Sequence, residues 1–381
     1  MERASQWGLL HETSAGTPMG KLLRRFWQPV ALSSSVAKGE AKPLKVMGEE
    51  LTLYRGDSGA AHLVGGRCAH RGTVLHTGWV QGELLRCMYH GWRYDATGLV
   101  TEIPAEKQPR AKPLRIAGYP VHEYCGLVFA WMADEPAPAF ELPRKMVLEE
   151  PGKHNIPLLQ VWDCNWFQQI ENSLDAVHVS FVHTWGRSTR FDQGITTSIP
   201  ELSYEETSSG VRQYARRSAD NVRVSDWTFP NNNHVIVPGP KKGDPWSDTV
   251  VWAVPIDDHS AMRFTIRSFH ASQGAFAREL AASPDAAWSP NDDRDDLFAR
   301  RFPDIGDQQF ITVQDYIAVA GQGTIANRVD ENLSSSDAGI LFLRKVFLRE
   351  LERIQAGEPT KQWTRLEEEH HLPLPAAEAG A

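Results

Sequence analysis

Hydrophobic and polar residues alternate in short runs over two stretches of this chain, and each stretch predicts an antiparallel sheet. The first begins after Pro43 and continues to about Trp131, with turn residues between the runs. The second lies between 195 and 270, where residues 257–260 suit a hairpin turn. The pattern therefore predicts a small antiparallel β domain followed by a further antiparallel sheet.

Helical spacing of apolar residues marks three further segments. A turn followed by a short amphipathic helix is predicted within 8–32, and a second helix is predicted over 310–320. The last helix has its apolar stripe over 340–354, with a cap at Ser335 or Ser336. A long C-terminal helix therefore follows the second sheet.

Two segments without this periodicity divide the chain. Clustered prolines break regular structure between about 134 and 155, and the domain boundary is expected there. We place an N-terminal domain at 1–148 and a second domain at 149–381. Residues 271–306 are rich in Ala, Ser, Pro, Asn and Asp, which predicts a long mobile connection. It is either a lid over a substrate or a solvated loop.

Composition and charge narrow the function classes. A net charge of -8 and a pI near 6.0 argue against a nucleic-acid-binding protein. No apolar run approaches the ~18 residues of a membrane span, and residues 1–5 have no signal-peptide core. The four cysteines do not suggest a disulfide framework. We therefore expect a cytoplasmic protein with neither a nucleic-acid nor a membrane partner.

Two short motifs in the first β stretch carry metal ligands. Cys68 and His70 form a Cys-x-His motif, and Cys87 and His90 form a Cys-x-x-His motif. Zinc accepts two cysteines and two histidines, and so does a Rieske [2Fe–2S] cluster. Zinc fingers usually keep Cys with Cys and His with His, whereas each motif here supplies one of each. This arrangement favours the cluster over zinc.

A second candidate site lies at His178 and His183, which are five residues apart. On an ideal helix their rings would point ~140° apart. They can share a metal only if the helix ends, or widens into a π-type bulge, between them. With one distant carboxylate they would form the facial triad of non-haem Fe(II) oxygenases. The alternative is two packed or exposed histidines near a helix end.

Taken together, these motifs resemble those of the oxygenase (alpha) subunits of Rieske non-haem iron ring-hydroxylating oxygenases. The matching segments are 68–72, 87–92 and 172–183. Residues 16–27 look like the phthalate dioxygenase branch of that family, and the likeness is weakest over roughly 185–305. The resemblance implies an α+β fold: an antiparallel β Rieske [2Fe–2S] domain, then a helix-grip (START-like) catalytic domain with an antiparallel sheet and a long C-terminal helix.

The resemblance also assigns roles around a mononuclear Fe(II). Asp315 matches the family's third iron ligand, with Asp307 and Asp304 as alternatives. Asp175 looks like the family's bridging aspartate, which holds His178 and meets a cluster histidine, His90 or His70, of a neighbouring subunit. Asn172 either lines the iron pocket or has a structural role as a cap or hydrogen-bond partner.

The function implied is that of a terminal oxygenase component. It would use O2 and electrons from a separate NAD(P)H-dependent reductase, of flavin and ferredoxin type, to hydroxylate a small aromatic substrate. The expected substrate is an aromatic carboxylate, and the expected assembly is a homotrimer. No G-x-G-x-x-G follows a strand, so a dinucleotide-binding site is not predicted in this chain.

Alternative functions, and the residues that would contact the substrate, stay open. O-demethylation of an aryl methyl ether is the nearest alternative activity. A Rieske electron carrier without oxygenase activity, and a ligand-binding helix-grip domain without iron, are alternatives from other classes. The candidate carboxylate-binding residues are Arg187, Arg190, Arg216, Arg217 and His234.

Overall fold

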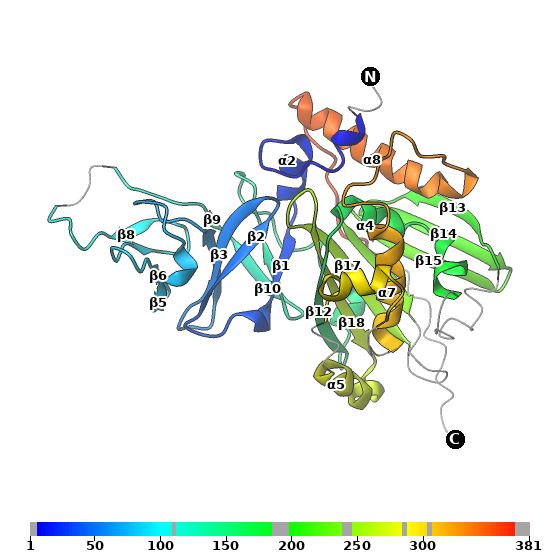
Figure 1. Cartoon of the computed structure of the whole chain (residues 1–381), viewed down its shortest axis with the longest axis horizontal. Coiled ribbons are helices and arrows are strands. Elements are labelled where there is room, and N and C mark those ends of the chain that lie inside the picture. The colour runs from blue at the N-terminus through cyan, green and yellow to red at the C-terminus, as the bar shows by residue number, and fades with distance from the viewer. Residues whose placement is uncertain are drawn as a thin grey trace.

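The computed structural model describes residues 6–108, 112–184, 198–237, 246–283, 288–302 and 307–369. Up to residue 131 the described strands form three antiparallel sheets, and a larger sheet follows (Figure 1). The predicted β stretch after Pro43 is confirmed. The alternating runs predicted between 195 and 270 are strands of the larger sheet, as expected.

The N-terminal sheets are built from short strands. Their orders are β1-β11-β10, β2-β3-β4-β9 and β5-β6-β7-β8. The bounds are β1 Gln28–Leu32, β2 Ala41–Val46, β3 Glu49–Arg55, β4 Ala61–Gly65, β5 Trp79–Gln81, β6 Leu84–Arg86, β7 Arg93–Tyr94, β8 Val100–Glu102, β9 Gly118–Tyr119, β10 Val121–Tyr124 and β11 Leu127–Ala130.

The larger sheet has the order β12-β18-β17-β16-β15-β14-β13 among the described residues, and every pair in it is antiparallel. Residues 257–260 form the turn between β17 and β18, as predicted, because the Asp257 carboxylate accepts the backbone N–H groups of His259 and Ser260. The bounds are β12 His154–Trp162, β13 Glu201–Glu206, β14 Gly210–Ser218, β15 Asn221–Thr228, β16 Asn232–Val237, β17 Ser247–Pro255 and β18 Ala261–Phe269.

Capping residues define where the helices begin. The Thr17 hydroxyl accepts the N–H of Gly20 at the start of α2, and the Asn165 side chain accepts the N–H of Phe167 at the start of α4. The bounds are α2 Pro18–Arg24, α3 Met146–Glu149, α4 Trp166–Ser173, α5 Gly274–Ala282, α6 Arg294–Phe298, α7 Asp307–Ala320 and α8 Ala338–Gln355.

The two faces of the larger sheet have different roles, because side chains alternate along each strand. On one face, Trp252 lies across from Phe264, and its ring meets Phe129 of β11 at 5.6 Å between centroids. The opposite face carries a cavity, bordered by Val251 and Arg263. Beyond the cavity, the same face packs Trp227 against Phe347 of α8.

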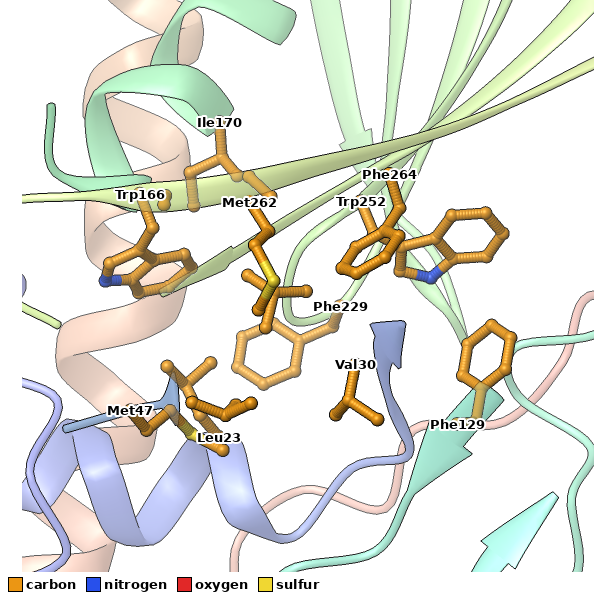
Figure 2. Packing of buried hydrophobic residues seen from close by; sticks show 14 of the residues in the cluster. Leu23, Val30, Met47, Phe129, Trp166, Ile170, Phe229, Trp252, Met262 and Phe264 are labelled. Atoms are coloured by element: carbon orange, nitrogen blue, oxygen red, sulfur yellow. The ribbon is translucent and has the colours of Figure 1, made fainter. Parts of the chain in front are cut away.

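The main hydrophobic core joins the N-terminal part to the larger sheet. Figure 2 shows Leu23 and Val30 packed close to Phe229 and Met262, and Phe129 on the side of Trp252. All six side chains are buried. Burial on this scale fixes the large sheet against the N-terminal sheets, and so fixes the walls of the cavity.

Two expectations differ from the structure. The long mobile connection predicted over 271–306 is not simply a loop, because its described part contains the helices α5 and α6. Leu280 and Phe276 of α5 pack against a small core that includes Phe269, and this tertiary contact sustains a short helix. The cap expected at Ser335 or Ser336 is wrong, because Ser334 caps a 3-10 turn and α8 begins only at Ala338.

The long C-terminal helix itself is confirmed as α8. None of the helices in the described residues is both long and apolar enough to cross a membrane.

Candidate functional site

The two Cys/His motifs occupy two similarly built loops, one after β4 and one after β6. In each loop a glycine N–H returns to the cysteine carbonyl: Gly72 to Cys68 at 2.9 Å and Gly91 to Cys87 at 3.1 Å. Both glycines have positive φ, +76° and +72°, which side-chain-bearing residues rarely adopt. The motifs therefore need glycine at these positions to close the loops tightly.

The loops bring the four side chains together as two kinds of ligand. Cys68 and Cys87 are free thiols, 4% and 1% exposed, and their side chains interact with each other. The rings of His70 and His90 lie outside them, with centroids 4.6 Å apart, and both residues are exposed. Two buried sulfurs beneath two exposed imidazoles fit the ligand set of a Rieske cluster.

Neighbouring groups orient these ligands. The Trp92 ring stacks on His70, with centroids 4.8 Å apart and an interplanar angle of 5°. The Tyr94 hydroxyl accepts the N–H of Ala69 and lies 3.0 Å from the Cys68 sulfur, to which it can donate its proton. Hydrogen bonds to sulfur of this kind stabilise a thiolate ligand.

The second site begins where α4 ends. Helix α4 stops at Ser173, and His178 and His183 lie on two separate 3-10 turns, His178–Ser180 and Val182–Thr184. Of the two possibilities that the spacing left open, the helix end is the one observed. Their ring centroids lie 5.3 Å apart, so the break turns both imidazoles to the same side.

Asp315 of α7 completes a compact group with these histidines. Its Oδ1 atom lies 3.5 Å from Nε2 of His178 and 3.4 Å from Nε2 of His183. One ligand atom from each residue falls within 4.8 Å of the others. Oδ1 is buried and makes no hydrogen bond within the described residues. A buried carboxylate oxygen facing two imidazole nitrogens fits a divalent cation with open coordination positions.

Gln314 orients His183 and was missed by the sequence analysis. Its Oε1 atom lies 3.1 Å from Nδ1 of His183, and an amide oxygen accepts a proton there. This leaves Nε2 without a proton and aimed at Asp315, as a metal ligand requires. Burial lowers the pKa of His183, which also favours the neutral ring at pH 7. The adjacency of Gln314 to Asp315 was the available signal.

Asp175 lies beside His178, in the segment that follows the end of α4 at Ser173. Its Oδ1 accepts the backbone N–H groups of Val177 and His178, at 2.9 and 3.2 Å. Its Oδ2 lies 3.8 Å from Nδ1 of His178, which is longer than a hydrogen bond. Asp175 and Asn172 both line the cavity and also a depression on the outer surface near Glu331.

The cavity beside His178, His183 and Asp315 has a volume of about 180 Å³. Its walls mix apolar side chains such as Val179 and Ile311 with polar groups from the sheet. Three arginines that were not among the candidate carboxylate-binding residues also line it: Arg223 of β15, and Arg263 and Arg267 of β18.

Of the five residues predicted as candidates to bind a carboxylate, none that the structure describes is among the residues that line this cavity. Arg187 and Arg190 lie outside the described residues. Arg216 is exposed and alternates with Arg217, so the two point to opposite faces of β14. His234 faces away from the cavity, where its Nε2 meets Asp248 at 3.0 Å, and is not available to a substrate. The alternative iron ligand Asp304 and the side chain of Asp307 also fall outside the described part.

Comparisons with known proteins agree with this geometry. A sequence profile of the Rieske [2Fe–2S] domain matches residues 26–124. The chain is 32% identical to the 5,5'-dehydrodivanillate O-demethylase oxygenase subunit of a Sphingobium strain, over 95% of this chain and 83% of that protein. It is 30% identical to the phenoxybenzoate dioxygenase subunit alpha of Ectopseudomonas oleovorans, over 91% and 85% of the two chains.

Similarity to solved structures extends over most of the fold. The terminal oxygenase of carbazole 1,9a-dioxygenase from a Novosphingobium strain superposes with a TM-score of 0.67 at 20% identity, covering 93% of this chain and 98% of that one. The chain belongs to the oxygenase (alpha) subunits of the Rieske non-haem iron oxygenases, enzymes that hold a [2Fe–2S] cluster and a mononuclear iron.

Proposed function

We propose that this chain is the terminal oxygenase of a multicomponent system that hydroxylates a small aromatic carboxylate. The relatives named above act on aromatic compounds according to their names, and they include a dioxygenase and an O-demethylase. A separate NAD(P)H-dependent reductase of flavin and ferredoxin type would supply the electrons. We place the enzyme in the cytoplasm, where its cysteines would stay reduced.

The proposed ligands divide between two centres. Cys68, His70, Cys87 and His90 would hold the cluster. His178, His183 and Asp315 would hold the iron, and the observation that carries this assignment is the buried, unsatisfied Oδ1 of Asp315. When bound, the cluster supplies electrons one at a time and the iron supplies the site at which O2 is activated.

The protein's own groups prepare that site. Asp315 would contribute one negative charge, and the two neutral imidazoles would contribute none. Because the protein supplies only three ligands, coordination positions stay open for oxygen and substrate. Gln314 holds His183 in the tautomer that presents Nε2. Val179 and Ile311 form part of the apolar wall, which limits water beside the reacting ring. Asn172, half-buried on the cavity wall, is positioned to contact a substrate.

The cavity supports a substrate of about one ring. Its volume of about 180 Å³ lies below the ~300–1,000 Å³ of pockets for drug-sized ligands. Arginine side chains on its wall favour an anionic substituent. A single-ring aromatic carboxylate satisfies both features.

The test is a product assay with a compatible reductase. Aromatic acids and aryl methyl ethers are supplied with O2 and NADH, and products are identified rather than NADH loss. Hydroxylated or cis-dihydroxylated acid supports the proposal. Formaldehyde with the matching phenol would instead favour O-demethylation, in which O2 and NADH convert the methyl ether to phenol, formaldehyde and water. No oxygenated product from a fully metallated enzyme would contradict both.

A further inference from the structure

The cavity contains a charged side chain, Arg223, that has no acidic partner among the described residues. Arg223 lines the cavity from β15, and within the described residues it makes no hydrogen bond or ion pair. It is close enough to His183 to lower the pKa of that imidazole. A cation without a partner in a partly desolvated site is unfavourable, and structures normally satisfy such groups.

Other arginines of the same sheet have partners. Arg212, on the outer face of β14, forms two hydrogen bonds with Asp226, at 2.6 and 3.1 Å. On the cavity side, Arg267 donates to the Ser247 hydroxyl and Arg263 lies over the Trp162 ring. Arg263 also has no hydrogen-bond acceptor among the described residues, but its guanidinium is covered by the Trp162 ring. Arg223 has neither an acceptor nor a ring partner among those residues.

A second arginine strengthens the positive charge at this place. Arg217 of β14 donates from Nε to the carbonyl of Ser198, but its two terminal nitrogens are buried and have no acceptor in the described part. Burial and the charge of Arg217 together lower the pKa of Arg223 to about 10, so Arg223 stays charged at pH 7. Two like charges side by side favour an anion between or beside them.

We propose that Arg223 binds the carboxylate of the aromatic substrate from the cavity wall, with Arg217 as a positioning residue that adds charge behind it. The proposal rests on the proposed function, because it assumes that the reacting ring enters this cavity. Arg223 on β15 would then hold the carboxylate end of the ring. The opposite end of the ring would face His178, His183 and Asp315. A charged pair of this kind gives orientation as well as affinity.

The experiment measures binding rather than turnover. The full-length enzyme with both metal centres is titrated anaerobically by calorimetry with benzoate and the three methoxybenzoates, and with the matching amides, which lack the charge. Wild type is expected to bind at least one acid more tightly than its amide. Arg223→Met should weaken that acid roughly 10- to 100-fold and leave the amide within twofold. Arg217→Met should lower the acid preference by a smaller factor.

Arg216→Met is the matched control, since Arg216 is exposed on the same strand and points away from Arg217. It should leave both affinities unchanged. Arg223→Gln provides the same test if the Met variant loses its metals. Equal losses for acid and amide would make Arg223 structural, and an unchanged acid affinity, or a wild type that prefers no acid, would overturn the proposal. Iron content and the product assay report separately on the proposed function.

Discussion

A single oxygen atom, Oδ1 of Asp315, decides how the second site is interpreted. It lies within 3.5 Å of Nε2 of both His178 and His183 and has no hydrogen bond among the described residues. Replacing Asp315 with Ala should remove the mononuclear iron and leave the cluster, because Asp315 lies on α7 and the cluster loops lie in the N-terminal sheets. Metal analysis beside the visible spectrum checks this. Full iron occupancy in the variant would move the third ligand to another acid, Asp307 first.

The visible absorption of the protein tests the proposed cluster ligands. Cys87 is 1% exposed and interacts with Cys68, and a hydroxyl cannot replace its thiolate. Cys87→Ser should abolish the red-brown absorption of the cluster together with the activity. An unchanged visible spectrum in that variant would show that the cluster is held by other residues.

At the scale of single residues, what could be predicted depended on whether a motif carried the information. The cysteines and histidines stand in short motifs, and Asp315 was identified by family resemblance. The cavity arginines have no motif. Arg263 and Arg267 alternate with Met262, Phe264 and Ile266, but which face of the strand borders a cavity is decided by packing elsewhere in the chain.

Among the elements, α4 carries the approach to the iron ligands, and a buried ion-pair network anchors it. Glu171 accepts hydrogen bonds from Arg344 of α8 at 2.7 Å and from Arg328 at 2.7 and 3.2 Å. All three residues are buried. Glu171→Gln leaves Arg328 without its acidic partner among the described residues, whereas Arg344 keeps its two hydrogen bonds to Glu331. The substitution should lower the free energy of unfolding by about 3 kcal/mol.

Chemical denaturation measures that loss. Glu352→Gln, an exposed position on α8, is the control and should stay within ~0.5 kcal/mol of wild type. A Glu171→Gln variant as stable as this control would mean that the network does not anchor α4.

Element boundaries were predictable where periodicity was strong and uninterrupted. The last helix fits its apolar stripe, whereas α5 lies in the segment whose composition predicts a mobile connection. Its sequence, Gly274–Ala282, is short for a helix that must be stable alone, and it forms because Phe276 and Leu280 pack against the sheet. The break after Ser173 is similar, since spacing alone allowed either a helix end or a bulge.

In the whole molecule, the cluster loops and the iron site belong to distant parts of one chain. Figure 1 shows β5, β6 and β8 at one end and α4 and α7 toward the other. Electron transfer needs the centres to be close, so we propose that the cluster of one subunit serves the iron of its neighbour in a homotrimer. Asp175, 28% exposed at its side chain and facing both the cavity and an outer depression, is the proposed link.

Asp175→Asn keeps the shape of that link and removes its charge. It should retain both metal centres and much of the assembly, yet slow electron transfer from cluster to iron drastically. A single-turnover reaction measures this: the cluster is reduced, oxygen and substrate are added, and cluster reoxidation is followed. Reoxidation at the wild-type rate in a fully metallated trimer would leave Asp175 only its bonds to the backbone N–H groups of Val177 and His178.

The central claim is that one chain holds two different iron centres. The most direct measurement is the iron and acid-labile sulfide content per chain of the purified wild type, taken beside that of Asp315→Ala. Three iron atoms and two sulfides in wild type, falling to two irons and two sulfides in the variant, are expected. Two irons and two sulfides already in the wild type, after reconstitution with Fe(II), would contradict the claim and leave an electron carrier.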